Sequence, residues 1–194
     1  MFLFFDTETT GLPTNWQAPI TDSDNWPRLV QLAWILADTQ GVVVDERSYV
    51  IKPEGFSIPS QAAAVHGITT AYAQKNGVLL SQALEEFLQA HQQAQALVAH
   101  NISFDINILG AECVRSNKPL SCMQTTHVCT MKASTNYCQL PGRYGPRWPK
   151  LIELHEILFE EPFVDAHDAL ADVRACKRCF YALTKRGVLK TQKL

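Results

Sequence analysis

The sequence begins with a short apolar run that ends in two acidic residues. Residues 2–5 read FLFF and lead directly into Asp6, Thr7 and Glu8. Successive side chains of a strand point to opposite faces, so Phe4, Asp6 and Glu8 would share one face of a sheet. Two neighbouring carboxylates raise each other's pKa and destabilise a fold unless a cation or hydrogen bonds offset the repulsion. The run therefore predicts either a divalent-metal site at the end of a strand or a polar turn after it, and the other acidic residues decide between these.

The length and composition of the chain predict one domain over residues 1–194. A chain of 194 residues with 46% hydrophobic residues can bury roughly 70% of its unfolded surface. Its apolar runs are shorter than the ~20 residues that a membrane helix needs, and no basic segment of a signal peptide precedes Asp6. We therefore expect a soluble, cytoplasmic protein that does not contact a membrane.

We expect the six cysteines to be free thiols, because no secretory signal precedes them. Cys176 and Cys179 form a C-x-x-C pair on a predicted helix, with no second pair and no histidine at the spacing of a zinc finger. This pattern favours a packing role over a metal or redox role. The six residues are Cys113, Cys122, Cys129, Cys138, Cys176 and Cys179.

Charge is unevenly distributed along the chain. The formal net charge is −2, but residues 1–140 carry 7 basic and 12 acidic side chains, whereas residues 141–194 carry 10 basic and 7 acidic. The C-terminal quarter is therefore the basic part of the chain. Two bound divalent cations would also change the total from −2 to +2. The net charge thus does not exclude a nucleic-acid partner.

The hydrophobic pattern predicts an α/β fold with a mixed sheet flanked by helices. Three strands come before any helix, and the second and third are predicted to pair as a hairpin around residues 39–41. Helices then alternate with two further short strands, an order that favours a mixed sheet with helices on its faces. The predicted strands cover residues 2–8, 29–38, 42–53, 96–101 and the start of 125–135. The predicted helices cover residues 59–67, 81–94, 103–117, 149–159 and 166–185.

Asp105 lies in the first turn of the helix that follows the strand at 96–101. Free backbone N–H groups and the helix dipole favour an anion there, and Asn101 could cap the helix. The junction lies at the carboxyl end of a strand, where ligands bind in open α/β sheets. Taken alone, Asp105 is more typical of an ordinary helix start.

His167 and Asp172 lie five residues apart near the start of the last predicted helix. Within a continuous helix they would be separated by about 140° and could not share a face, but they converge if His167 lies at the helix start. Asp172 would then point into the protein from a stretch rich in alanine and leucine, where a buried acid needs a cation. The alternative is an acid-rich turn followed by a solvated helix face, and the segment alone does not choose between the two.

Four short motifs occur in order along the chain. They are FFDTETTG from residue 4, VHGIT from residue 65, HNISFD from residue 100 and HDALAD from residue 167. With these motifs the sequence resembles the DEDDh (DnaQ-like) 3'-5' exonucleases, a group that includes polymerase proofreading subunits, ribonuclease T and oligoribonuclease. The resemblance implies a ribonuclease-H-like fold with a five-stranded mixed sheet, in agreement with the predicted strands.

The resemblance also implies roles for individual residues. His167 matches the position of the general base. The metal ligands, which would be catalytic together with it, are Asp6, Glu8, Asp105 and Asp172. The residues that would surround the 3'-terminal nucleotide are Thr9, Val65, His66, Asn101 and Phe104.

The chemistry of phosphodiester hydrolysis supports these assignments independently. In-line attack needs a nucleophile made from water and stabilisation of the leaving 3' oxygen, which two metal ions ~3.5–4 Å apart supply together. Carboxylate oxygens are hard ligands that suit two divalent cations, Mg²⁺ or Mn²⁺. The imidazole of His167, with an unperturbed pKa of ~6.5, can accept the proton of the water at neutral pH.

The loop before the helix at 149–159 is a predicted contact for the substrate strand. It interleaves cations with aromatic rings, as the binding of a single strand requires. The alternative is a packing tryptophan with incidental surface charge, in which case the loop that carries Trp16 and Trp26 is the next candidate. The residues concerned are Arg143, Tyr144, Arg147 and Trp148, followed by Lys150.

The leading hypothesis is a metal-dependent 3'-5' exonuclease that acts on the 3' ends of single-stranded nucleic acid, DNA rather than RNA, and releases nucleoside 5'-monophosphates. The first alternative is an RNA exonuclease similar to oligoribonuclease or ribonuclease T. The second is a non-catalytic nucleic-acid-binding relative, which the presence of all four acids and the histidine disfavours. Association with a polymerase and formation of a homodimer stay open, as do proofreading and DNA repair as cellular roles.

Overall fold

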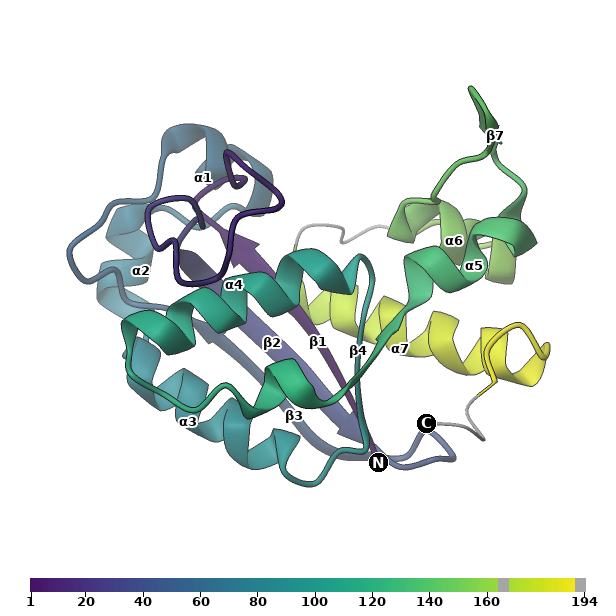
Figure 1. Ribbon diagram of the computed structural model, residues 1–194, viewed down its shortest axis with the longest axis horizontal. Coiled ribbons are helices and arrows are strands. Elements are labelled where there is room, and N and C mark those ends of the chain that lie inside the picture. The colour runs from purple at the N-terminus through teal and green to yellow at the C-terminus, as the bar shows by residue number, and fades with distance from the viewer. Residues whose placement is uncertain (164–167, 191–194) are drawn as a thin grey trace.

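A five-stranded mixed sheet forms the centre of the molecule (Figure 1). The computed structural model describes residues 1–163 and 168–190. The strand order is β3-β2-β1-β4-β5, in which β1 runs antiparallel to β2 and parallel to β4. The strands are β1 (Phe2–Thr9), β2 (Leu29–Ala37), β3 (Val43–Val50), β4 (Ala96–Ala99) and β5 (Thr126–Cys129). This topology confirms the predicted mixed sheet and the predicted hairpin of its second and third strands.

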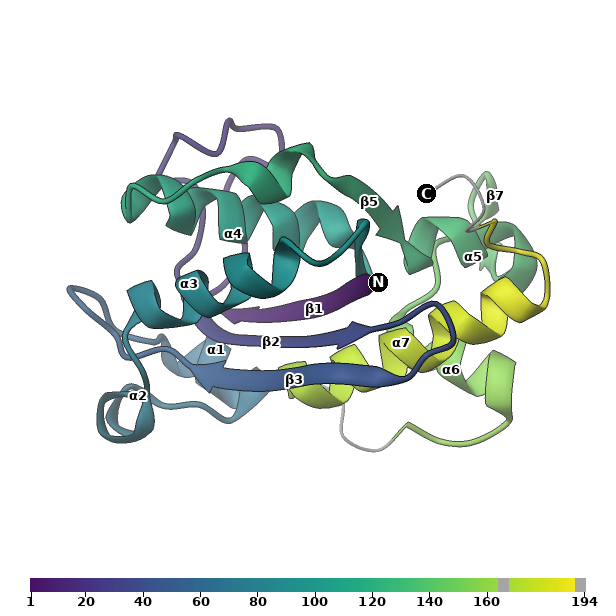
Figure 2. The ribbon, with the colours of Figure 1, turned by 90° about the horizontal axis from the view of Figure 1, so that it is seen from below.

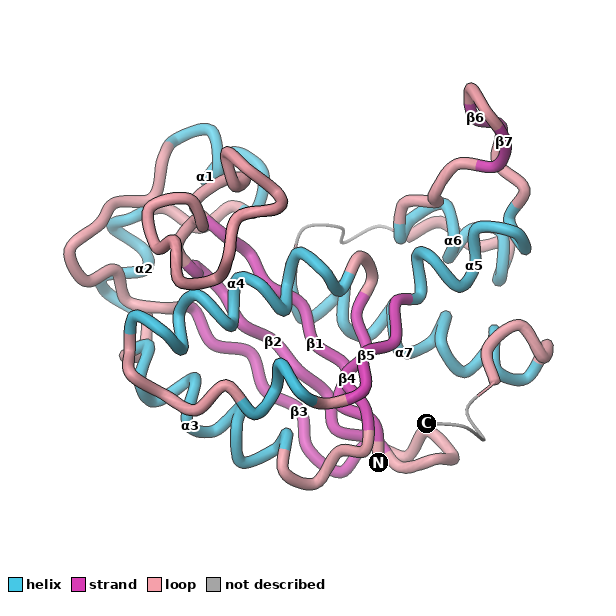
Figure 3. Tube along the Cα trace, in the orientation of Figure 1, coloured by secondary structure: helices cyan, strands magenta, loops and turns pink. Residues whose placement is uncertain are grey.

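Helices cover both faces of the sheet, with α3 and α4 on one face and α7 on the other (Figure 2). A small hairpin of β6 (Pro141–Gly142) and β7 (Gly145–Pro146) stands away from the sheet, beyond α5 and α6 (Figure 3). None of the helices in the described part of the chain has the length and apolar character needed to cross a lipid bilayer. The helices are α1 (Ser60–His66), α2 (Thr70–Asn76), α3 (Leu80–His91), α4 (Ile102–Arg115), α5 (Thr130–Cys138), α6 (Leu151–Phe159) and α7 (Ala169–Lys185).

The central strand β1 is buried on both faces. Leu3 belongs to the core beneath α3 and α4, whereas Phe4 belongs to the core beneath α7. The ring of Phe4 lies edge-on to that of Phe180 in α7, with centroids 5.2 Å apart. A slip of one residue would exchange every side chain between the faces, so the two cores hold the register that directs Asp6 and Glu8 toward α7.

The end of β1 and the starts of two helices meet at one edge of the sheet. β1 and β4 are parallel, so their carboxyl ends share this edge, and α4 begins directly after β4. Gln31 of β2 lies opposite Glu8 in the β1–β2 ladder. Its side-chain oxygen accepts a hydrogen bond of 3.3 Å from the backbone N–H of Ala169, which fixes the start of α7 at the same edge.

Two helices are present that the hydrophobic pattern does not predict. α2 has seven residues and buries only Ala73, which is too short for a periodic signal, and the hydroxyl of Thr69 caps it by accepting from the N–H of Tyr72. α5 follows the short strand within residues 125–135, where Ser134 donates a 2.7 Å hydrogen bond to the carbonyl of Thr130. The described part of the last helix begins at Ala169, and residues 166–167 of its predicted range lie outside the described residues.

A buried carboxylate joins α4 to the start of β2. Glu112 of α4 is fully buried. Its Oε1 accepts hydrogen bonds of 2.9 Å from Nε of Arg28 and from the backbone N–H of Leu29, and Nη1 of Arg115 lies 3.2 Å from the same oxygen. Glu112 thereby anchors the end of the long loop between β1 and β2.

Replacing Glu112 by alanine should lower the free energy of unfolding by about 3 kcal/mol, because removal of one partner from a buried ion pair leaves the other charges uncompensated. Urea denaturation monitored by circular dichroism measures the change. Glu85→Ala is the control, since the Glu85 side chain is 62% exposed on α3 and should matter by less than about 0.5 kcal/mol. A loss for Glu112→Ala no larger than that of the control would contradict the anchoring role.

Candidate active site

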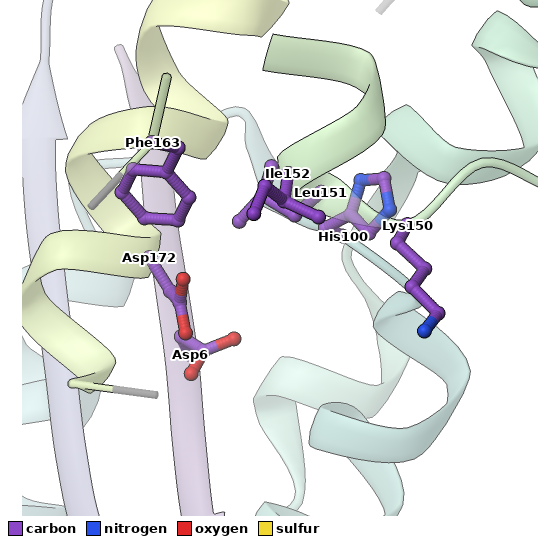
Figure 4. Close-up of a pocket in the computed structure, with 7 residues that line it drawn as sticks. All are labelled: Asp6, His100, Lys150, Leu151, Ile152, Phe163 and Asp172. Carbon is purple, nitrogen blue, oxygen red and sulfur yellow. The ribbon is translucent and has the colours of Figure 1, made fainter. Parts of the chain in front are cut away.

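Three acidic side chains converge at the end of β1. Asp6 and Glu8 of β1 and Asp172 of α7 each offer a carboxylate oxygen, and these oxygens all lie within 4.8 Å of one another. Figure 4 shows the carboxylates of Asp6 and Asp172 close together, one projecting from the strand and the other from the helix. The pleat of β1 and the first turn of α7 thus bring together acids from opposite ends of the sequence.

The start of α7 is held in place by two polar side chains. Asp168 is the N-cap residue and accepts a 3.0 Å hydrogen bond from the N–H of Ala171. The side-chain amide of Gln31 donates to the other carboxylate oxygen of Asp168 at 3.4 Å, while its carbonyl oxygen accepts from Ala169. These contacts attach the first turn of α7, which carries Asp172, to the β2 strand beside β1.

The fourth predicted ligand, Asp105, approaches from the opposite face of β1. It lies in the first turn of α4, is buried, and accepts hydrogen bonds from Thr7, 3.2 Å from the backbone N–H and 2.7 Å from the hydroxyl. Its charge still raises the pKa of both Asp6 and Glu8. The structure therefore brings Asp105 near the other three acids but does not place it in the group whose oxygens lie within 4.8 Å.

Burial and mutual repulsion raise the pKa values of these carboxyl groups. Burial is the largest cause of the pKa of Asp6 lying well above its usual range, and the charges of Asp105, Asp172 and Glu8 add to it. Burial also raises the pKa of Glu8 to about 8, and Asp172 makes the next largest contribution. The pKa of Asp105 is raised to about 7 by burial, against which the hydrogen bonds from Thr7 act.

This donor set fits a divalent cation. Among residues 1–163 and 168–190, neither Asp6 nor Glu8 forms an ion pair with a lysine or arginine. Hard carboxylate oxygens at this spacing are the ligands that Mg²⁺ and Mn²⁺ prefer. A bound cation would also lower the raised pKa values, because an opposite charge nearby favours the ionised form.

The predicted general base, His167, lies outside the described residues. Two of the residues predicted to surround the terminal nucleotide, Thr9 and His66, are neighbours, because the backbone of Thr9 forms a hydrogen bond with His66. Burial lowers the pKa of His66, and this hydrogen bond opposes the shift. Val65 is exposed beside them, at the end of α1. These residues lie at the end of β1 and in α1, on one side of the acids.

Asn101 and Phe104 lie at the start of α4. Asn101 occupies the N-cap position in a left-handed conformation, with φ of 70°, but its side chain does not cap the helix and instead accepts from the hydroxyl of Ser103 at 3.3 Å. The ring of Phe104 packs against that of Trp16, with centroids 5.7 Å apart. The structure thus divides the five predicted nucleotide contacts between two places, α1 with the end of β1, and α4.

The acids open into a cavity of about 440 Å³. Asp6 and Asp172 lie on one side of it, whereas His100 and Lys150 lie on the other (Figure 4). The ammonium group of Lys150 is the cationic group in the lining, and the apolar part of the lining is formed by Leu151, Ile152 and Phe163. A cavity with clustered acids on one wall and a cation on the other suits a phosphodiester bridged to the acids by metal ions.

His100 is a residue of this cavity that the sequence pattern does not assign to the site. Its Nε2 lies 3.0 Å from the carbonyl oxygen of Pro149 and its Nδ1 lies 3.0 Å from the hydroxyl of Thr130. Burial lowers the pKa of His100 to about 4, so the ring is neutral at pH 7, donating from Nε2 and accepting at Nδ1. The available signal was its place directly before Asn101 in the HNISFD motif.

The residues between 143 and 148 that are predicted to contact the substrate strand differ in their surroundings. Arg147 forms a paired salt bridge with Glu153 of α6, at 2.6 and 2.8 Å, which lowers the pKa of Glu153 to about 2. Tyr144 is 90% exposed at the tip of the β6–β7 hairpin, and the guanidinium of Arg143 lies 5.1 Å from the centre of its ring. Trp148 is exposed as well. Contact of these residues with a strand stays a prediction.

The loop between β1 and β2 carries one exposed and one buried tryptophan. Trp26 is only 2% exposed, and its indole N–H donates to the carbonyl of Pro19 at 3.1 Å. Trp16 is 53% exposed. Trp26 therefore has a structural role, and of the two only Trp16 is available to a ligand.

Comparison with known protein families identifies the chain. The model of the RNase T family, described as exonuclease, matches residues 3–180. The chain belongs to this exonuclease family. No curated protein matches the sequence. Members of this family generally depend on divalent metal ions.

Solved structures show the same fold. Exonuclease I of E. coli in complex with a 5cy-dT13 oligonucleotide has a TM-score of 0.75 at 19% sequence identity, covering 95% of this chain and 40% of that one. The zinc-ion-bound form of the E. coli exonuclease I complex with single-stranded DNA has a TM-score of 0.70 at 21% identity, with the same coverage. Exonuclease X in complex with 5' overhanging duplex DNA has a TM-score of 0.58 at 22% identity, and the match covers 96% of this chain and 93% of that one. The ribonuclease-H-like fold is thereby confirmed, and the chain spans less than half the length of exonuclease I.

The raised carboxyl pKa values predict how stability depends on pH. Unfolded Glu and Asp have pKa values of ~4.3 and ~3.9, whereas folded Glu8 has about 8 and Asp105 about 7. The folded protein therefore binds more protons than the unfolded chain between these values, so the metal-free protein should lose stability as pH rises. The lowered pKa values of His66, His91 and His100 act in the opposite sense only below about pH 6.5.

Melting temperatures at pH 6.5 and pH 8 measure this effect in the window from about 6.5 to 8. In EDTA the melting temperature of the parent should be lower at pH 8 than at pH 6.5. The same difference should be smaller for Glu8→Gln. Added Mg²⁺ should remove most of the decrease, since a ligand that binds the folded state stabilises it. A metal-free melting temperature that is constant or rises across this window would contradict the electrostatic description of the site.

Proposed function

We propose that the chain is a metal-dependent 3'-5' exonuclease that hydrolyses the terminal phosphodiester of single-stranded nucleic acid, DNA in preference to RNA, and releases nucleoside 5'-monophosphates. The observation that supports this most directly is the convergence of Asp6, Glu8 and Asp172, two of which line a cavity, in a chain of the exonuclease family. The 3'-5' direction rests on the DEDDh motifs that the sequence carries.

The residues that would hold two divalent cations, Mg²⁺ or Mn²⁺, are Asp6, Glu8 and Asp172, with Asp105 beside them. When bound, such ions make a nucleophile from water and stabilise the leaving 3' oxygen. Three separate elements, β1, α4 and α7, supply the acids, so the site depends on the packing of both helices against β1.

The other residues of the cavity bind and orient the substrate in this proposal. Lys150 lies across the cavity from Asp6 and offers its positive charge to the phosphate that is cleaved. Neutral His100 holds the carbonyl of Pro149 and so fixes the segment that carries Lys150. His167 takes a proton from water. The residues around the terminal nucleoside are Thr9, Val65, His66, Asn101 and Phe104.

The preference for DNA is supported by the structures that share the fold. Exonuclease I is seen with single-stranded oligonucleotides of DNA, and exonuclease X with overhanging duplex DNA. An RNA exonuclease similar to ribonuclease T is the second candidate, because this family carries that name. Matched 5'-labelled single strands of DNA and RNA with Mg²⁺ or Mn²⁺ distinguish them by the rate at which each is shortened from its 3' end.

Asp6→Ala should reduce hydrolysis to below ~1% of the parent rate. Loss of a residue that only hydrogen-bonds a metal ligand already lowers metal affinity or activity by about 10- to 100-fold, and loss of a ligand should cost more. The rate at which 5'-labelled single-stranded DNA is shortened from its 3' end in Mg²⁺ is the measurement. The metal-free melting temperature should be unchanged or higher, since one of the repelling charges is gone. Glu85→Gln is the matched control in an exposed helix position. Activity of Asp6→Ala within tenfold of the parent would contradict the assignment of metal ligands.

His167→Ala should lower turnover by ~10²–10⁴-fold while metal binding is largely retained. It should also remove the acidic limb of the pH-rate profile, because that limb reports protonation of the general base. His127→Ala, which changes an exposed histidine of β5, is the control. If the acidic limb persists in His167→Ala, another residue acts as the base.

A further inference from the structure

A second cavity, of about 410 Å³, lies next to the acidic one. Among the described residues, the side chains that line it carry no charge and consist of two indoles, a thioether, two amides and a hydroxyl. The lining residues are Trp16, Asn101, Ser103, Asn107, Met131 and Trp148. Its size is within the range of ligand pockets, and its chemistry differs from that of the cavity with Asp6 and Asp172.

Both tryptophans of this cavity are exposed, in contrast to the other two in the chain. Trp16 is 53% and Trp148 is 59% exposed, whereas Trp26 and Trp34 are 2% and 1% exposed. Large aromatic side chains that remain exposed at a hollow in the surface indicate a binding site rather than packing. The two indoles come from segments far apart in the sequence, so only the folded chain brings them together.

Trp16 is held in position by its neighbours. Its ring packs against Phe104, which precedes Asp105 in α4. The loop that carries it is tied by Asn25, whose side-chain oxygen accepts hydrogen bonds of 2.7 Å from the Thr14 hydroxyl and the Asn15 N–H. The indole is therefore largely ordered before a ligand binds, which reduces the entropy lost on binding.

Trp148 is flanked by two fixed residues. On one side Arg147 is bound to Glu153 of α6, and on the other the carbonyl of Pro149 is bound by His100. The main chain that carries the indole thus has a defined position, although the indole itself is exposed.

The two cavities share a common wall. His100 and Lys150 line the acidic cavity, while their chain neighbours in the two segments, Asn101 and Trp148, line the second one. The hydrogen bond between His100 and Pro149 joins the two segments within this wall. A strand bound at the acids therefore passes directly beside the cavity of the two tryptophans.

We propose that this second cavity binds an unpaired base of the substrate strand, from a nucleotide upstream of the terminal one. The inference rests on the exonuclease function proposed above. Every base has a flat aromatic face that stacks on an indole, and amide side chains hydrogen-bond base edges. The described residues of the cavity include no cation that could bind a phosphate, whereas Lys150 offers a cation in the neighbouring cavity. Asn101, in the wall between the cavities, is assigned to the terminal nucleotide, but neither Trp16 nor Trp148 is. The base in the cavity of the two indoles therefore belongs to the next nucleotide along the strand.

Abasic scanning tests the proposal. A short 5'-labelled DNA strand with one abasic residue, placed in turn at each position from the 3' end, is bound to the parent protein in EDTA, where no hydrolysis occurs. One upstream position should show binding weaker by about 5- to 100-fold, the contribution of one stacked base. Trp148→Ala and Trp16→Ala should each bind the intact strand more weakly and lose the sensitivity at that position, while Trp148→Phe should retain it.

Tyr137→Ala is the matched control, because Tyr137 is an exposed aromatic residue of α5 that does not line the cavity. Melting temperatures of all variants should match the parent, since the three residues are exposed. A scan without a sensitive upstream position, sensitivity confined to the terminal residue, or sensitivity that persists in both alanine variants would overturn the proposal.

The proposed activity is measured separately, as release of monophosphate from the intact strand in Mg²⁺. If the parent shows the tryptophan-dependent scan but releases no monophosphate, the base site stands and the exonuclease function fails. If the parent releases monophosphate but the scan is flat, the exonuclease function stands and the base site fails.

Discussion

Repulsion among carboxylates at the end of β1 is the constraint on which the rest of this structure depends. Burial alone raises the pKa of Asp6 and of Glu8, and each neighbouring acid raises it further. A cluster of buried carboxylates lowers the stability of the fold, so contacts elsewhere must hold these side chains close together. The two apolar cores on the faces of β1 provide them, because they fix the strand whose pleat directs both acids toward α7.

Polar contacts at the edge of the sheet complete this arrangement. Thr7 holds Asp105 from one face of β1, and Gln31 holds the start of α7 on the other. Each acid outside β1 is therefore attached to a rigid helix that is itself bonded to the sheet. The site is organised before any cation binds, and binding of a cation would stabilise the folded state by relieving the repulsion.

The same edge of the sheet also organises the surroundings of the acids. The segment from Trp148 to Lys150 contributes a cation to one cavity and an indole to the next, and His100 fixes it to the end of β4. A charged cavity beside a neutral aromatic one matches the two parts of a nucleotide chain, its phosphates and its bases. Under the proposal made above, recognition would rest on stacking, which accepts any base.

The sequence by itself determined the order of the five sheet strands and of the helices other than α2 and α5, the mixed sheet and the faces of β1, because these follow from local periodicity. The alternation of Leu3 and Phe4 between two cores agrees with what the pattern predicted. The grouping of Asp172 with Asp6 and Glu8 was implied by the family resemblance and not by periodicity. The short helices α2 and α5 were not predicted, because seven to nine residues with few buried positions carry little periodic signal.

Only the tertiary structure decided which distant side chains meet. Asp105 is bound by Thr7, and Arg147, predicted as a strand contact, is bound to Glu153. Trp16 and Trp148 come to line one cavity, whereas Trp26, from the same loop as Trp16, is buried. Periodicity gives the face of an element on which a side chain lies, but the partner across that face depends on how separate elements pack, and one-dimensional spacing does not encode that packing.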